Sequence, residues 1–158
     1  MAEVRVGLGF DVHPPAADRP LMLGGVAFEG EPGLAGHSDG DAVCHALADA
    51  LLGAAALGDV GEHFSDTDRA FAGIAGLDLL GRVVAMVEAE RFAVTSADVT
   101  VVAERPAIAP ARAAIRRAVA GCLRVAEDRI SVKATRPEGL GLTGEGIGCL
   151  AVALLERA

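Results

Sequence analysis

Two segments in the first third of the chain carry side chains that together could hold a metal ion. Asp11 and His13 end a segment of alternating apolar and small or polar residues, so as positions i and i+2 of a strand they point to the same side. His45 follows in a helical pattern. One carboxylate and two imidazoles form a borderline ligand set that suits Zn²⁺ and leaves a fourth coordination position open. These three residues predict a catalytic or substrate-binding zinc site.

His45 shares a predicted helix face with two carboxylates. Asp41, His45 and Asp49 recur every four residues, a spacing that drifts by only about 40° per step around an α-helix. We expect a polar stripe in which the carboxylates fix the tautomer of the imidazole. Ser38 and Asp41 also resemble a capping box at the start of this helix. The alternative is an ordinary surface loop at the end of the strand and a core histidine in the helix.

Two further segments are rich in groups that bind hydroxyls and phosphates. Segment 58–73 contains Asp, Ser, Thr and Gly residues that could bind a substrate's hydroxyl groups, although the same residues make ordinary turns. Near the other end of the chain, Thr135 and Arg136 could hold a phosphate, and Glu138 could hold Mg²⁺. An ordinary exit from a strand into a loop explains this second segment equally well.

The composition narrows the class of ligand. The 158 residues are 52% hydrophobic and carry 14 Lys and Arg against 22 Asp and Glu, a net charge of -8. This acidic balance, with 5 Phe and no Trp or Tyr, disfavours a protein that tracks nucleic-acid phosphates or stacks bases. An acidic chain binds a diphosphate only where local cations outweigh its own field. The sequence favours a metal-assisted phosphoryl reaction on a small polar molecule.

No feature of the sequence is typical of an exported or membrane protein. The N-terminus lacks the basic and apolar regions of a signal peptide, and the longest apolar stretch, around residues 50–57, is too short to span a bilayer. Cys44, Cys122 and Cys149 are far apart and odd in number, which is typical of reduced thiols. We expect a cytoplasmic protein with no membrane or nucleic-acid partner.

The elements that must position these residues alternate between strands and helices. Apolar patterns predict strands over 4–10, 21–26, 98–104 and 130–135, and helices over 41–57, 77–91 and 110–123. Loops are expected up to residue 36, over 58–73 and before a final apolar run over 147–155. This order predicts a single domain over residues 1–158 with a two-layer α/β (α+β) fold, with helices on one face of a mixed sheet. Since no helix remains for the other face, we expect a homo-oligomer packed through it.

Longer runs around these residues resemble the 2-C-methyl-D-erythritol 2,4-cyclodiphosphate synthases, a family of the non-mevalonate pathway to isoprenoids. The resemblance covers nearly the whole chain, and its carriers are runs 9–13 (GFDVH), 35–41 (AGHSDGD), 45–61 (HALADALLGAAALGDVG), 64–68 (FSDTD), 132–135 (VKAT) and 138–141 (EGLG). It implies a mixed four-stranded sheet with a short hairpin, and a homotrimer packed through the sheets with active sites between subunits.

The resemblance also implies a reaction and its metals. The family converts 4-diphosphocytidyl-2-C-methyl-D-erythritol 2-phosphate into the cyclic diphosphate and CMP. The 2-phosphate attacks the β-phosphorus and CMP leaves, without water or a covalent enzyme intermediate. Zn²⁺ would lie on Asp11, His13 and His45, and Mg²⁺ or Mn²⁺ on the substrate's diphosphate near Glu138. Catalysis would then consist of positioning and charge neutralisation.

Further site residues follow from the same resemblance. His37 and Arg136 are the candidate catalytic residues, with His37 and Ser38 beside the reacting phosphates. The methylerythritol hydroxyls would be held by Asp59, Val60, Gly61, Phe64, Ser65, Asp66, Thr67 and Asp68. The substrate would also contact Asp11, Val12, His13, His37 and Ser38. The cytidine diphosphate half would contact Ala103, Pro106, Ala134, Thr135 and Glu138.

The chain departs from the family pattern at four places. Arg136 stands where a second Thr is usual near the α-phosphate, Ala107 where a Lys is common, and Leu8 where a His is frequent. In the loop 141–146, Leu142 replaces a Phe and an Arg-Gly pair is missing, so we expect an isoprenoid diphosphate site on the trimer axis to be weakened or absent. The alternatives to an active synthase are a non-catalytic nucleotide- or metal-binding trimer and a metal-dependent phosphohydrolase.

Overall fold

The computed structural model describes residues 3–157. The strands are β1 (Val4–His13), β2 (Pro15–Leu23), β3 (Val26–Leu34), β4 (Phe92–Val102), β5 (Ile130–Thr135) and β6 (Ile147–Arg157). The α-helices are α1 (Ala42–Ala55), α2 (Val60–His63), α3 (Gly76–Ala89) and α4 (Arg112–Leu123), with 3₁₀ turns at Arg69–Phe71, Ala109–Ala111 and Glu127–Arg129.

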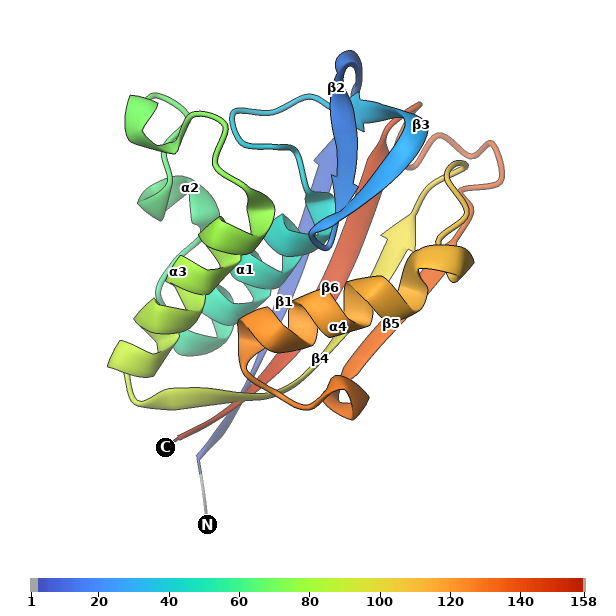
Figure 1. The fold of residues 1–158 in the computed structure, drawn as a ribbon. Helices are drawn as coiled ribbons and strands as arrows, with labels where there is room; N and C mark the ends of the chain where they lie inside the picture. The colour runs from blue at the N-terminus through green and yellow to red at the C-terminus, as the bar shows by residue number, and fades with distance from the viewer. Residues whose placement is uncertain (1–2, 158) are drawn as a thin grey trace.

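β1, β6, β4 and β5 form a four-stranded sheet in that order (Figure 1). β6 pairs antiparallel with both β1 and β4, whereas β4 and β5 are parallel and are connected through α4. The expected mixed sheet is therefore confirmed, with β1 and β5 as its two edges. β2 and β3 form a separate two-stranded hairpin, which confirms the short hairpin as well.

The helices α1, α3 and α4 lie on one face of this sheet, as expected for a two-layer fold (Figure 1). α1 contacts β1 and β6, α4 contacts β5, and α3 lies against α1 and α4. Fully buried side chains such as Leu47, Leu51, Leu80 and Leu155 form the core between the layers. β1 turns its odd-numbered residues toward α1, and its two glycines are buried there. This face of β1 also carries Asp11 and His13.

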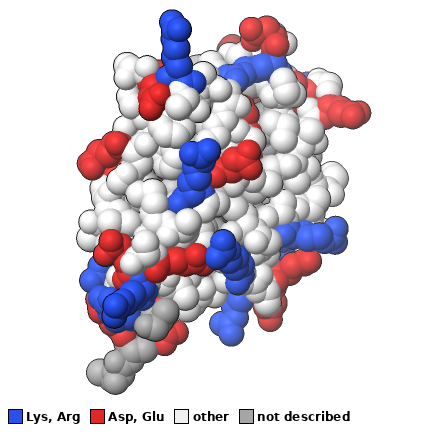
Figure 2. Space-filling model, turned by 60° about the vertical axis from the view of Figure 1, so that its left-hand side comes forward, with Lys and Arg blue, Asp and Glu red and all other residues white. Residues whose placement is uncertain are grey.

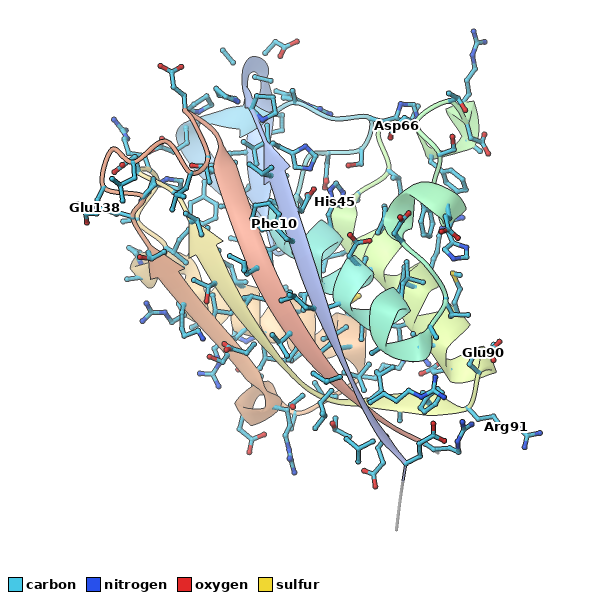
Figure 3. The ribbon with its side chains drawn as sticks, turned by 180° about the vertical axis from the view of Figure 1, so that it is seen from behind. Phe10, His45, Asp66, Glu90, Arg91 and Glu138 are labelled. Carbon is cyan, nitrogen blue, oxygen red and sulfur yellow. The ribbon has the colours of Figure 1, made fainter. Side chains whose placement is uncertain are left out.

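The even-numbered residues of β1 point away from the helices and form, with two residues of β6, an outer apolar face. Among the described residues, no element of this chain covers that face, which Figure 3 shows from behind with Phe10 labelled. The side chains of this face are 40–67% exposed: Val4, Val6, Leu8, Phe10, Val12, Leu150 and Val152. An apolar surface of this extent on a sheet indicates an interaction surface.

The hairpin corrects the expectation of one short strand followed by a loop to residue 36. β2 and β3 form despite Pro20 and Pro32, because the two prolines face each other in a ribbon with free edges, where their missing N–H groups break no central ladder. β1 and β4 are longer than expected and reach His13 and back to Phe92. The segment 58–73 is not a plain loop, since it contains α2 and the turn Arg69–Phe71.

The charged side chains, the helix lengths and the cysteines can be compared with the composition. Basic and acidic side chains are interspersed on the face shown in Figure 2, and no basic stripe follows that face. None of the described helices is long and apolar enough to cross a membrane. Cys44, Cys122 and Cys149 are free thiols, and burial raises the pKa of each.

Candidate active site

Asp11, His13 and His45 converge on one point between the end of β1 and the first turn of α1. Asp11 Oδ2 lies 2.6 Å from His13 Nε2 and 3.1 Å from His45 Nδ1, and the two ring nitrogens are 3.1 Å apart. Donor atoms bound to one tetrahedral Zn²⁺ stand roughly 3.3 Å apart. To hold the ion, the Asp11 and His13 atoms therefore need to separate by about 0.7 Å and the other two pairs by about 0.2 Å.

Each imidazole is oriented through its second nitrogen. His13 Nδ1 donates to the carbonyl oxygen of Ala35 at 2.7 Å, which leaves the lone pair of Nε2 for the metal. His45 Nε2 lies 2.8 Å from the hydroxyl of Ser38, so its Nδ1 faces Asp11. Such partners hold metal-ligating histidines in one tautomer and one ring orientation. The donor set and its supports fit a divalent metal.

The expected polar stripe on α1 is wrong in its details. Asp41 is the N-cap of α1 and is fully buried, and its carboxylate accepts hydrogen bonds from four backbone N–H groups. Asp49 accepts from the N–H of Val60 at 2.8 Å. Within residues 3–157, neither carboxylate hydrogen-bonds to the His45 ring, whose Nε2 lies against the Ser38 hydroxyl. The expected Ser38–Asp41 capping box is replaced by Asp41 acting alone.

The pKa values of Asp11 and His13 shift in opposite directions, which favours a proton on His13 beside an ionised Asp11. Burial raises the pKa of Asp11, but hydrogen bonds from His13 and His45 lower it further, to well below the ordinary 3.8. Burial lowers the pKa of His13, and the hydrogen bond and charge of Asp11 raise it above the ordinary 6.5. A divalent cation would take the place of this proton, because metal binding competes with protons for the same lone pairs.

The triad opens into a cavity of about 430 Å³ between β1, α1 and the segments on either side of α2. Figure 3 shows His45 and Asp66 at the same end of the molecule, on neighbouring elements. The predicted site residues that line this cavity are Asp11, His13, His37, Ser38, His45, Asp59, Val60, Gly61, Phe64 and Asp66. Sequence reasoning missed Gly36, Phe71, Ile74 and Leu79, and assigned Asp49 to another role. The three apolar side chains carry no chemical signal in the sequence.

His37 and Ser38 enter the cavity from the segment between β3 and α1. His37 Nε2 lies 3.1 Å from the carbonyl oxygen of Asp68, and Ser38 is nearly buried. The N–H of Gly73 donates to the carbonyl of His37, which ties this segment to the turn before α3. Both side chains therefore lie beside the triad with their backbone held in place.

Apart from the residues predicted for the cytidine diphosphate and Arg136, four predicted residues do not line this cavity. Val12 points to the outer apolar face, opposite Asp11 and His13. The hydroxyls of Ser65 and Thr67 bind each other at 2.8 Å, and the Asp68 carboxylate caps the turn Arg69–Phe71.

A second group of predicted residues lies at the other edge of the sheet. A smaller cavity of about 190 Å³ near the end of β5 is lined by Ala103, Pro106, Ala107, Ile108, Ala109, Arg112, Ala134, Thr135 and Arg136. Glu138 is exposed on the following loop and lines neither cavity; Figure 3 shows it beside the β5 edge of the sheet, whereas His45 lies beside the β1 edge. One chain thus holds the predicted site as two separate halves.

Comparisons with known proteins agree on one family. The model of the YgbB family matches residues 4–156. The chain is 48% identical over 156 residues to a 2-C-methyl-D-erythritol 2,4-cyclodiphosphate synthase of Idiomarina loihiensis, covering 98% of both chains. It is 51% identical to the synthase of Trichlorobacter lovleyi, covering 96% of this chain and 98% of the relative. A solved structure of such a synthase in its CDP-bound form has a TM-score of 0.88 and 36% identity, and covers 96% of this chain and 99% of that one.

Proposed function

We propose which residues of this chain bind the metal, the reacting phosphates and the rest of the substrate, because the chain belongs to the YgbB family. This is an enzyme family of 2-C-methyl-D-erythritol 2,4-cyclodiphosphate synthases in isoprenoid synthesis. The reaction converts 4-diphosphocytidyl-2-C-methyl-D-erythritol 2-phosphate into the cyclic diphosphate and CMP. The convergence of Asp11, His13 and His45 beside His37 and Ser38 in one cavity supports this assignment most directly.

Asp11, His13 and His45 would hold Zn²⁺ through the three atoms that face one another. A bound Zn²⁺ supplies Lewis acidity toward a phosphoryl oxygen. Asp11 contributes the single negative charge of the donor set, so the loaded site keeps a net positive charge. That charge offsets, locally, the acidic balance of the chain.

His37 and Ser38 would contact the reacting phosphates. An oxygen of the 2-phosphate forms a bond to the β-phosphorus, and the bond from that phosphorus to the bridging oxygen breaks with both electrons leaving on CMP. His37 can donate a hydrogen bond to the charge that develops on the phosphoryl oxygens. Both reacting groups belong to one molecule, so the main task of the chain is to bring them together.

The segment at α2 would bind the methylerythritol hydroxyls. Asp59 and Asp66 offer carboxylates to the cavity, and Val60, Gly61 and Phe64 line it beside them. Asp49 holds the N–H of Val60, so this wall of the cavity is anchored to α1. Ser65, Thr67 and Asp68 would complete the same segment from outside the cavity.

The half-site at β5 would bind the cytidine diphosphate. Ala103, Pro106, Ala134 and Thr135 offer backbone and small side-chain groups to the cytidine, and the exposed Arg136 offers its charge to the α-phosphate. Glu138 would bind Mg²⁺ or Mn²⁺ on the diphosphate.

Two half-sites at opposite sheet edges favour an active site shared between subunits. β1 and β5 are the two edges of the sheet, three strand spacings or about 14 Å apart, with β6 and β4 between them. A homotrimer packed through the outer apolar faces would bring the β1 edge of one subunit to the β5 edge of the next. It would also bury the exposed side chains of β1 and place Val12 at the interface between subunits. Residues 1–158 would act as one cytoplasmic domain in this assembly.

The direct test is ³¹P NMR of the protein with the cytidylyl substrate, Zn²⁺ and Mg²⁺, beside a chelator control. Metal-dependent appearance of a cyclic diphosphate together with CMP is the expected result. Intact substrate in the presence of a folded, zinc-loaded protein would instead indicate a nucleotide-binding protein. Reaction in H₂¹⁸O separates the remaining alternative, since a phosphohydrolase introduces oxygen from water into its product.

A further inference from the structure

Arg19 of β2 binds three carbonyl groups of the segment that leads from β3 to α1. Its Nη1 donates to Leu34 at 3.1 Å and to Gly36 at 2.9 Å, and its Nη2 donates to Ser38 at 2.6 Å. The sequence analysis gave this residue no role, and the site predicted from the resemblance does not include it.

Each of the five backbone carbonyls of residues 34–38 accepts a hydrogen bond, and the Arg19 guanidinium donates three of these five bonds. The other two are bound by His13 Nδ1, which donates to Ala35, and by the N–H of Gly73, which donates to His37. Arg19 has no carboxylate within ion-pairing distance among residues 3–157. Its planar fork is therefore committed to the backbone of this segment, a geometry that a single ammonium cannot reproduce.

The local backbone directs the Arg19 side chain toward residues 34–38. The register of β2 and β3 shifts between Ala16 and Pro20, so Arg19 lies in a bulge of β2. A Cβ on Gly33 would lie 2.3 Å from the carbonyl oxygen of Arg19, so the opposite strand needs glycine at that position. Bulges of this kind re-aim side chains beside functional sites.

The segment that Arg19 holds supports both imidazoles of the metal triad. The bonds to Leu34 and Gly36 flank the Ala35 carbonyl that accepts from His13. The bond to the Ser38 backbone fixes the residue whose hydroxyl contacts His45. One side chain thus sets the position of both groups that orient the histidines.

We propose that Arg19 is a positioning residue for the metal centre, which acts by holding the Ala35 carbonyl and the Ser38 hydroxyl against His13 and His45. This inference rests on the proposed zinc site. Arg19 forms no hydrogen bond with the side chains of Asp11, His13 and His45, so we expect it to act through the segment 34–38. Outer partners of metal-ligating histidines typically contribute about 10–100-fold to metal affinity.

Three variants of the full-length protein test the proposal. Arg19→Ala removes the three bonds, Arg19→Lys keeps the charge without the fork, and Arg116→Ala is the matched control. Arg116 likewise binds two backbone carbonyls, those of Glu127 and Ile130, but on α4 away from the cavity. The readouts are Zn²⁺ affinity by competition with a chelator, and the ¹⁵N NMR signals of the His13 ring, which report its tautomer.

We expect Arg19→Ala to weaken Zn²⁺ binding about 10–100-fold and to give His13 a mixture of tautomers, with Arg19→Lys between it and the wild type. Arg116→Ala should keep wild-type Zn²⁺ affinity. Addition of guanidinium at millimolar concentration should restore part of the affinity of Arg19→Ala only. Wild-type Zn²⁺ affinity in Arg19→Ala would overturn the proposal.

A His45→Ala variant separates this failure from a failure of the zinc site itself. If His45→Ala loses Zn²⁺ while Arg19→Ala keeps it, the metal site stands and the role of Arg19 is wrong. If His45→Ala also binds Zn²⁺ like the wild type, the triad is not the metal site, and the inference about Arg19 falls with it.

Discussion

The backbone of α1 lies directly on Gly9 of β1: a Cβ atom at position 9 would stand 1.9 Å from the carbonyl oxygen of Ala46. Gly7 and Ala50 repeat this contact one helical turn further along. No side chain intervenes between helix and strand at these two points. Because His45 precedes Ala46, and Asp11 lies two residues after Gly9 on the same face of β1, this close approach brings the metal-ligating atoms together.

Gly9→Ala should separate α1 from β1 and damage the metal site. The added methyl meets a backbone oxygen that cannot rotate away, so we expect a loss of about 3 kcal/mol in the free energy of unfolding and weaker Zn²⁺ binding. Urea denaturation and chelator competition measure the two effects. Gly53→Ala is the matched control, since Gly53 lies in α1 with open space around it. That change should be neutral or stabilising by up to about 1 kcal/mol.

Asp41→Asn should destabilise the protein without altering any metal ligand. The buried Asp41 carboxylate accepts from the N–H groups of Gly24, Gly25, Val43 and Cys44 at 2.7–3.1 Å, which joins the β2–β3 turn to the start of α1. An amide turns one acceptor oxygen into a donor facing other donors, so we expect a loss of about 3 kcal/mol.

Asp78→Asn is the control for this substitution. Asp78 is exposed in the first turn of α3, and its loss should cost no more than about 1 kcal/mol. Equal stability of the two variants in denaturant would show that the Asp41 carboxylate does not join the hairpin to α1.

The metal-free protein should become less stable as the pH rises from 6 to 8. The lowered pKa of Asp11 contributes stability that is present above pH 3.8 and is lost as the pH falls through the pKa of Asp11 in the folded protein. The raised pKa of His13 contributes stability that is present below pH 6.5 and is lost as the pH rises through the pKa of His13 in the folded protein. The ion pair between Asp11 and His13 therefore stabilises the metal-free protein between roughly pH 4 and 6.5.

Thermal unfolding in the presence of a chelator checks this dependence. His13→Gln should flatten the fall in Tm between pH 6 and 8, because the variant has no ring to lose a proton. Saturating Zn²⁺ should reverse the trend, since metal binding favours neutral imidazoles. If the Tm of the metal-free wild-type protein rises between pH 6 and 8, the assignment of this dependence to the Asp11–His13 ion pair is wrong.

Leu8→Glu should break the proposed trimer but spare the metal site. Leu8 is 67% exposed on the outer apolar face, where a buried charge without a partner would oppose association. Sedimentation equilibrium should give a monomer mass, and turnover should be lost because the two half-sites no longer meet. Zn²⁺ affinity should stay at the wild-type value, because all three ligands come from one chain.

The control for the outer apolar face adds the same charge on the helical side of the molecule. Ala85→Glu, at an exposed position of α3, should leave both the mass and the turnover unchanged. A Leu8→Glu variant that remains a trimer would show that subunits associate through another surface.

Local patterns in the sequence were sufficient to predict β1, β4, β5, the three long helices and the candidate metal ligands, whereas β6 was expected only as an apolar run. Alternation along β1 puts Asp11 and His13 on one face, and helical periodicity places His45 on α1, since both periods follow from backbone geometry. The hairpin was harder to predict, because Pro20 and Pro32 argue against strands unless they face each other in an isolated ribbon. That pairing is a tertiary fact.

The sequence by itself therefore determined which residues could ligate a metal, but the tertiary structure decided what holds them. Helical spacing pointed to Asp41 and Asp49 as partners of His45, whereas the folded chain gives that place to Ser38. The support from Arg19 comes through three carbonyl groups, and every residue type has a carbonyl. Bonds to backbone groups leave no trace in residue types or spacing, so they are visible only once the chain has folded.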